Sequence, residues 1–131
     1  MFVTMLIGIY DSNKKEILIS NAGHEPPLIL SKDGKFSNFE ESGPPHGIQN
    51  KIQYTEKILP FSESSIYIFT DGITEIKSPK GDMLGSEGFQ NYIKKYQSTP
   101  NNERLKTIID EILKEGHVQK DDLTIVVIDG K

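Results

Sequence analysis

Apolar residues in the first half of the chain form short runs that predict β-strands. Residues 2–10 form one continuous apolar run, and residues 16–20 form a second run after the turn-forming residues 11–13. The two runs predict a hairpin, and the apolar character of nearly every position in 2–10 predicts that this strand is buried. Further strands are expected at 28–30, 35–39, 52–59, 65–70 and 123–128.

The spacing of apolar residues changes between the last two of these strands. The apolar residues from 89 to 96 recur at the spacing of one helix face, and a wider stripe with the same period runs from 105 to 113. Pro100, between the stripes, suits the start of the second helix, and Gly116 suits the position just after its end. Many antiparallel strands followed by a late helix pair indicate the α+β fold class.

The composition indicates one globular domain and excludes several classes of function. The chain has 131 residues, with 15 Lys and Arg against 19 Asp and Glu, whereas a nucleic-acid binder normally carries a basic face. Because no cysteine is present, disulfides and thiolate metal sites are excluded, and a reducing, cytoplasmic setting is expected. No apolar run reaches the ~18 residues that span a bilayer, so no direct membrane insertion is expected.

Aspartates stand at the ends of the last two expected strands. Asp71 follows the first of these strands, and Asp121 and Asp122 precede the second. If the strands pair antiparallel, the carboxylates converge at one sheet edge, and we expect those of Asp71 and Asp121 within about 8 Å of each other. Carboxylates without cysteine suit Mg²⁺ or Mn²⁺. A turn at Asp71-Gly72 and a helix-to-strand cap at Asp121-Asp122 are the alternative interpretations.

Five short segments, which together extend over nearly the whole chain, occur in a specific order and spacing. They are Phe-Val-Thr-Met at 2–5, Asn-Ala-Gly-His-Glu-Pro-Pro at 21–27, Gly-Pro-Pro-His-Gly-Ile at 43–48, Thr-Asp-Gly-Ile-Thr-Glu at 70–75 and Asp-Asp-Leu-Thr-Ile-Val-Val-Ile at 121–128. In this combination the sequence resembles the SpoIIE/RsbU branch of the metal-dependent protein phosphatases (the PPM family). The resemblance implies an antiparallel β-sandwich flanked by helices, in α-β-β-α layers.

The same resemblance implies an activity, a substrate and a cofactor. It implies a phosphatase that acts on phosphoserine or phosphothreonine, in a phosphorylated anti-anti-sigma-type (STAS-like) regulator of bacterial partner-switching signalling. Two Mn²⁺ or Mg²⁺ ions would hold the water that attacks phosphorus. Carried over by position, Asp71 and Asp121 match metal ligands of the family, and no further residue is assigned to catalysis.

Four other motif residues are expected around these ligands. Gly72 matches the glycine that lets the chain turn away from the metal, and Asp122 is expected to support the ligands rather than bind the metal itself. Thr70 belongs to the same motif as Gly72. His24 is expected to orient its own loop by hydrogen bonding.

One motif of the family is absent from the sequence. It is an Asp-x-x-Gly-His-Gly segment, upstream of the Phe-Val-Thr strand, whose aspartate bridges both metal ions in the family. Residues 1–131 are therefore expected to form the C-terminal two-thirds of a single phosphatase domain, truncated at the N-terminus. We expect this chain to hold one ion weakly or none, and its activity to be impaired. The alternative is a non-catalytic pseudophosphatase or protein-interaction module, and the uncovered strand edges predict a homo-oligomer.

Overall fold

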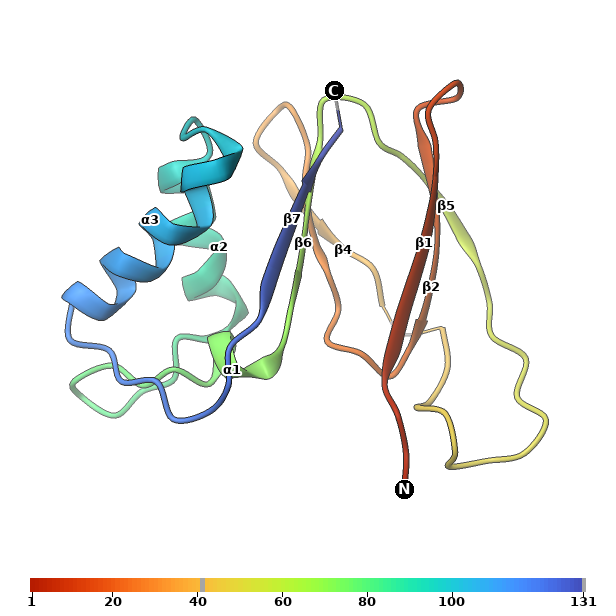
Figure 1. Ribbon diagram of the computed structural model, residues 1–131, viewed down its shortest axis with the longest axis horizontal. Helices are drawn as coiled ribbons and strands as arrows, with labels where there is room; N and C mark the ends of the chain where they lie inside the picture. Colours follow the sequence, from red (N-terminus) through yellow and green to blue (C-terminus); the bar gives the residue numbers. More distant parts are fainter. Residues whose placement is uncertain (41, 131) are drawn as a thin grey trace. The chain divides into compact units, whose positions relative to one another are not determined.

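A computed structural model describes residues 1–40 and 42–130 of the chain (Figure 1). The strands are β1 (Met5–Asp11), β2 (Glu16–Ala22), β3 (Leu28–Leu30), β4 (Phe36–Asn38), β5 (Lys57–Pro60), β6 (Ser65–Phe69) and β7 (Ile125–Asp129), and the helices are α1 (Asp71–Thr74), α2 (Gly85–Tyr96) and α3 (Asn101–Lys114). Hydrogen-bonded strands follow the order β1-β2-β5 in one sheet and β4-β3-β6-β7 in the other. The α+β class with antiparallel sheets is confirmed.

Two compact parts make up the chain. The first part is Met1–Ile66 together with the chain from Ile128, and the second part is Tyr67–Val127. In the first part, β1 and β2 pair antiparallel over their whole length, as the sequence predicts. The turn between them is closed by the Asp11 carboxylate, which accepts hydrogen bonds from the backbone N–H groups of Asn13 (2.9 Å) and Lys14 (3.0 Å).

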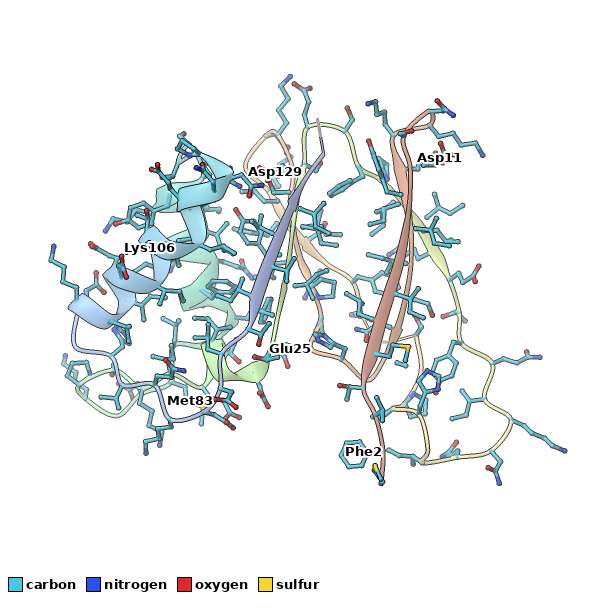
Figure 2. All side chains as sticks on the ribbon, in the orientation of Figure 1. Phe2, Asp11, Glu25, Met83, Lys106 and Asp129 are labelled. Carbon is cyan, nitrogen blue, oxygen red and sulfur yellow. The ribbon has the colours of Figure 1, made fainter. Side chains whose placement is uncertain are left out.

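The prediction of a buried strand at residues 2–10 is wrong. Regular pairing begins only at Met5, and the Phe2 side chain near the start of the chain is 63% exposed (Figure 2). Ile7 and Ile9, in the middle of β1, are 54% and 64% exposed. β1 pairs with β2 along one edge. Burial of its side chains also needs a second layer over the strand's face, and the described residues leave one face open.

The buried side chains of the first part come from the other face of this sheet and from the second hairpin. Ile17 and Ile19 of β2 are buried, and Phe61 meets the Tyr10 ring edge-on at 5.8 Å between centroids. β3 and β4 form the hairpin expected around Asp33-Gly34, where Gly34 has a φ of 76°. The strand expected at 52–59 is shorter and later, because only Lys57–Pro60 pairs with β2.

In the second part, the two predicted helices form and bury the central residues of their apolar stripes, whereas Leu113 at the end of the second stripe is 44% exposed. Figure 1 shows α2 and α3 side by side. Phe89 of α2 and Ile108 of α3 are completely buried, and the Phe89 ring packs edge-on against Phe69 (5.1 Å) and Tyr67 (6.5 Å) of β6. Gly116 follows the end of α3 with a φ of 85°, the left-handed conformation expected just after a helix.

β6 and β7 run antiparallel, and this pairing positions the candidate site. The Gly130 N–H donates to the Ser64 carbonyl (2.8 Å) at one end of the pair, and the Thr70 N–H donates to the Thr124 carbonyl (3.1 Å) at the other. The end of β6 therefore lies beside the segment that leads into β7. This is the arrangement on which the expected convergence of aspartates depends.

Candidate functional site

Thr70 joins the end of β6 to the segment before β7 through two hydrogen bonds. Its N–H donates to the Thr124 carbonyl, and its Oγ1 accepts from the Thr124 N–H, each at 3.1 Å. Both backbone groups of Thr124 are thereby satisfied by one residue. The position of the next residue, Asp71, is fixed by this junction.

Asp71 begins the single helical turn α1, which the sequence pattern did not predict. Its carbonyl accepts hydrogen bonds from the Glu75 N–H (2.9 Å) and the Thr74 Oγ1 (3.0 Å). Gly72 and Ile73 are buried, whereas Asp71 is exposed. The backbone of Asp71 is therefore held in place while its carboxylate stays accessible.

Gly72 is in close contact with the other aspartate-bearing segment. A Cβ atom at this position would lie 2.2 Å from the carbonyl oxygen of Asp122. This distance is far below any normal van der Waals contact, so only glycine fits here without displacing the backbone. The requirement for glycine comes from space rather than from an unusual φ, and it brings Asp71 next to the segment that contains Asp121 and Asp122.

The second aspartate-bearing segment has its own local hydrogen bonds. One Asp121 carboxylate oxygen accepts from the Asp122 N–H (2.7 Å), and the Asp121 carbonyl accepts from the Gln119 side-chain amide (2.8 Å). Further back, Val118 and Lys77 exchange backbone hydrogen bonds of 2.8 and 3.3 Å. The segments 70–77 and 118–124 are thus joined at both ends, with Asp71 and Asp121 between the joints. The separation of the two carboxylates stays a prediction.

Asp71, Asp121 and Asp122 supply some, but not all, of the ligand atoms that a divalent cation needs. Their carboxylates are hard oxygen ligands of the kind that Mg²⁺ and Mn²⁺ prefer. Within residues 1–40 and 42–130, however, no three His, Asp or Glu side chains are grouped so that they could hold a metal ion. One oxygen of Asp121 also already accepts a backbone hydrogen bond. The described residues therefore do not make up a two-ion centre by themselves.

His24 lies in the first part, in the loop that follows β2. The fully buried Asn21 side chain makes two hydrogen bonds to the His24 backbone. It accepts from the His24 N–H (2.8 Å) and donates to the His24 carbonyl (3.0 Å). The Nδ1 of His24 lies 2.9 Å from the Glu25 carbonyl oxygen, so this nitrogen carries the proton and donates. Gly23 leaves room for Pro45, since a Cβ there would lie 2.4 Å from the proline ring. The imidazole is oriented by its own loop.

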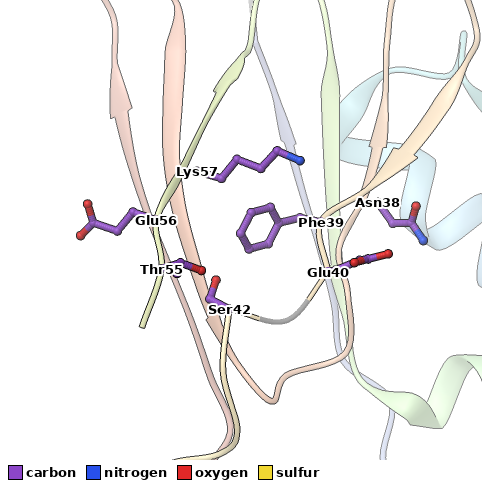
Figure 3. Close-up of a pocket in the computed structure, with 7 residues that line it drawn as sticks. All are labelled: Asn38, Phe39, Glu40, Ser42, Thr55, Glu56 and Lys57. Carbon is purple, nitrogen blue, oxygen red and sulfur yellow. The ribbon is translucent and has the colours of Figure 1, made fainter. Parts of the chain in front are cut away.

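The sequence did not predict a hollow of about 470 Å³ in the first part (Figure 3). Ser42, Thr55 and Lys57 line it, and the Lys57 ammonium lies 5.9 Å from the centre of the Phe39 ring. Figure 3 shows Glu56 directed away from that ring. These residues show no spacing in the sequence that distinguishes them from ordinary loop residues.

The fold defined by these sheets and helices is that of the PP2C-like phosphatase domains. The SiaA-PP2C domain of Pseudomonas aeruginosa superposes with a TM-score of 0.78 at 19% identity, over 98% of this chain and 52% of that one. The RsbU and RsbW domains of Rv1364c from Mycobacterium tuberculosis give 0.77 at 22% identity, over 95% and 35% of the two chains. The manganese-presoaked phosphatase domain of SpoIIE from Bacillus subtilis gives 0.70 at 19%, over 97% and 56%.

Sequence comparison then defines the family. Residues 1–131 match the family described as Stage II sporulation protein E (SpoIIE), and the chain belongs to this family. It is 31% identical to the phosphoserine phosphatase RsbU of Bacillus subtilis, over 100% of this chain and 40% of that protein. It is also 28% identical to protein IcfG of Synechocystis, over 98% of this chain and 20% of that protein. The chain therefore spans less than half the length of these relatives.

The helices of the described chain give one further result. In residues 1–40 and 42–130, every helix is too short or too polar to cross a membrane.

Proposed function

We propose that this chain is part of a protein serine/threonine phosphatase domain in which Asp71 and Asp121 contribute metal ligands. The observation that carries the proposal is the close approach of Gly72 to Asp122, which leaves no room for a side chain and brings the two aspartate-bearing segments against each other. Membership of the SpoIIE family and the similarity to a phosphoserine phosphatase support the reaction class.

The proposal includes the cofactor and the substrate. The ions would be Mn²⁺ or Mg²⁺, and when bound they would supply the positive charge that a chain of net charge −4 lacks for handling a phosphate dianion. Gly72, Thr70 and Asp122 would shape the backbone around the ligands. The substrate would be a phosphorylated anti-anti-sigma-type, STAS-like protein. The absence of cysteine agrees with action in the cytoplasm.

The proposal also covers the extent of the domain and its activity. Residues 1–131 would be the C-terminal two-thirds of a single phosphatase domain, and the bridging carboxylate of the metal pair would come from an Asp-x-x-Gly-His-Gly segment outside this sequence. The 131-residue chain alone would then bind Mn²⁺ poorly and turn over little substrate. A non-catalytic interaction module is the second candidate, favoured by the lack of three grouped ligands among the described residues.

The decisive measurement is Mn²⁺-dependent release of phosphate from a phosphorylated anti-anti-sigma-type protein. It compares the 131-residue chain with the full-length gene product. We expect turnover by the full-length product, and a loss of about 100-fold or more in Asp71→Asn and Asp121→Asn, because a ligand's charge and geometry disappear together.

Asp110→Asn on α3 is the matched control, since Asp110 is exposed and pairs with Lys106. It should keep full activity. Metal-dependent turnover that survives both ligand substitutions would refute the assignment of Asp71 and Asp121. A full-length product that binds the partner without hydrolysing it would establish the interaction module instead.

A further inference from the structure

Three side chains form a row beside the candidate site, in the second part of the chain. Lys77 pairs antiparallel with Met83 on one side and with Val118 on the other. Residues directly opposite each other in antiparallel pairs project from the same face, so the three side chains share one face. Met83 (Figure 2) and Val118 are 60% and 55% exposed, and Lys77 is half-buried. We call this surface, made of Lys77, Met83 and Val118, the Lys77 row.

The burial of the neighbouring residues shows that the Lys77 row is on the outward face of its loops. Ile76, which precedes Lys77, is buried, and so is the hydroxyl of Ser78, which follows it. Because neighbouring residues of an extended segment project from opposite faces, the face with Ile76 and Ser78 meets the core. Met83 and Val118 therefore face solvent on either side of Lys77.

The charge of Lys77 is not neutralised within the described chain. Among residues 1–40 and 42–130, no carboxylate forms an ion pair with the Lys77 ammonium. Lys80 and Lys120, on the same two loops, are exposed. Outside the candidate site, the carboxylates of these loops are Glu75, at the end of α1, and Asp82, which projects from the face opposite the row. The row therefore complements an apolar side chain that has an acidic neighbour.

The Lys77 row lies close enough to the candidate site to contact a protein that is bound there. Val118 precedes Asp121 by three residues, so their Cα atoms are at most about 11 Å apart. One side of a standard protein–protein interface covers roughly 800 Å², which is a disc of roughly 16 Å radius. Val118, Asp71 and Asp121 are all exposed. A folded phosphoprotein with its phosphate at the two aspartates would therefore extend over Val118, whereas a small phosphate ester would not.

We propose that the Lys77 row is a docking site for the phosphoprotein substrate, which contacts it through an apolar and an acidic side chain near its phosphorylated residue. This inference rests on the proposed function, because it places the substrate phosphate at Asp71 and Asp121. The apolar side chain lies against Met83 and Val118, and the carboxylate pairs with Lys77. The row binds the protein surface of the substrate and does not touch the reacting phosphate, so it determines specificity rather than chemistry.

Kinetics with a large and a small substrate test the proposal. The full-length gene product is assayed with Mn²⁺ on a phosphorylated anti-anti-sigma-type protein and on p-nitrophenyl phosphate, which is too small to reach the row. We expect Lys77→Glu to raise KM for the phosphoprotein at least about tenfold, because a repulsion replaces an attraction. Met83→Ser and Val118→Ser should each raise this KM about fivefold through lost apolar contact. The kcat for the phosphoprotein and the turnover of p-nitrophenyl phosphate should not change.

Lys106→Glu on α3 is the matched control, because it makes the same charge change outside the row. Lys106 is exposed and pairs with Asp110, and a surface ion pair of this kind contributes little to stability. The control should leave both activities unchanged. Circular dichroism establishes that each variant is folded.

A binding measurement separates failure of this inference from failure of the proposed function. The labelled phosphoprotein is titrated with the full-length product in EDTA, which stops metal-dependent turnover, and fluorescence anisotropy records binding. If the wild type hydrolyses neither substrate, the proposed function is wrong. Binding that is at least about tenfold weaker in Lys77→Glu would still establish the row as the docking site.

Three results would overturn the proposal. The first is phosphoprotein binding that is absent in the wild type or unchanged in Lys77→Glu. The second is an equal loss of activity on the phosphoprotein and on p-nitrophenyl phosphate, because it would show that Lys77 supports the site itself. The third is a dimer in sedimentation that Val118→Ser dissociates, because it would show that a second copy of the chain occupies the row.

Discussion

β1 and β6 are both short apolar strands, yet their burial is opposite. Ile66 and Tyr67 of β6 are completely buried, whereas Ile7 and Ile9 of β1 are 54% and 64% exposed. β6 has aromatic packing from α2, whose Phe89 ring meets the Tyr67 ring edge-on. An apolar run therefore specifies a strand, but a facing layer decides whether that strand belongs to the core.

The largest expected effect tests the difference in burial between β6 and β1. Phe89→Ala removes the ring that packs on β6 and should lower the free energy of unfolding by about 3–5 kcal/mol, the usual cost of deleting a buried aromatic side chain. Ile9→Ala in β1 should change it by less than about 1 kcal/mol, because the side chain is mostly in water. Urea denaturation followed by circular dichroism measures both. Similar losses of unfolding free energy in Phe89→Ala and Ile9→Ala would contradict the difference in burial between β6 and β1.

Two glycine substitutions compare how tightly the backbone is packed at the candidate site and in β1. Gly72→Ala forces a Cβ to within 2.2 Å of the Asp122 carbonyl oxygen, and it should cost about 1–3 kcal/mol and displace the aspartate-bearing segments. Gly8→Ala in β1 is the control, since its Cβ would lie 3.3 Å from the movable end of the Ile17 side chain. It should cost less than Gly72→Ala in the same urea titration. A Gly72→Ala variant as stable as the Gly8 control would contradict the tight contact.

The parts of the fold that depend on local signals could be predicted from the sequence. The Asp11 turn, the Asp33-Gly34 hairpin and the helix stripes each depend on residues close together in the chain. The exposure of β1 could not be predicted, because it depends on which residues face the strand. Arg104 was also missed: its position in α3 reads as polar, but it is buried and donates to the Thr99 carbonyl (3.0 Å) and to Tyr67 (3.3 Å).

The candidate site also has one feature that the sequence predicted and one that it did not. Antiparallel β6 and β7 bring the segments of Asp71 and Asp121 together, as the placement of the aspartates at strand ends led us to expect. Gly72 is required because of its contact with Asp122. The two residues are about fifty positions apart in the sequence, so no local sequence pattern contains this contact. Motif resemblance pointed to the glycine, and the structure supplies the physical reason.

The smallest expected effect concerns a polar contact between α2 and the residue that follows α3. The Tyr92 hydroxyl of α2 donates to the Glu115 carboxylate just after α3. Burial of the phenol, and then this hydrogen bond, raise the pKa of Tyr92 to about 12 from its ordinary value of 10.0. The folded chain therefore keeps the phenol proton at a pH where the unfolded chain loses it. The resulting stabilisation is complete below about pH 10 and is lost as the pH rises toward 12.

Tyr92→Phe tests this contact because it removes the titrating group and leaves the ring. Urea midpoints are measured for the wild type and the variant on either side of the ordinary tyrosine pKa, at about pH 9 and pH 11. Other tyrosines and lysines titrate in both chains and cancel in the difference. We expect the wild type to lose more stability than Tyr92→Phe over this interval. Parallel losses in the wild type and Tyr92→Phe would show that the hydroxyl of Tyr92 does not couple α2 to the end of α3 in solution.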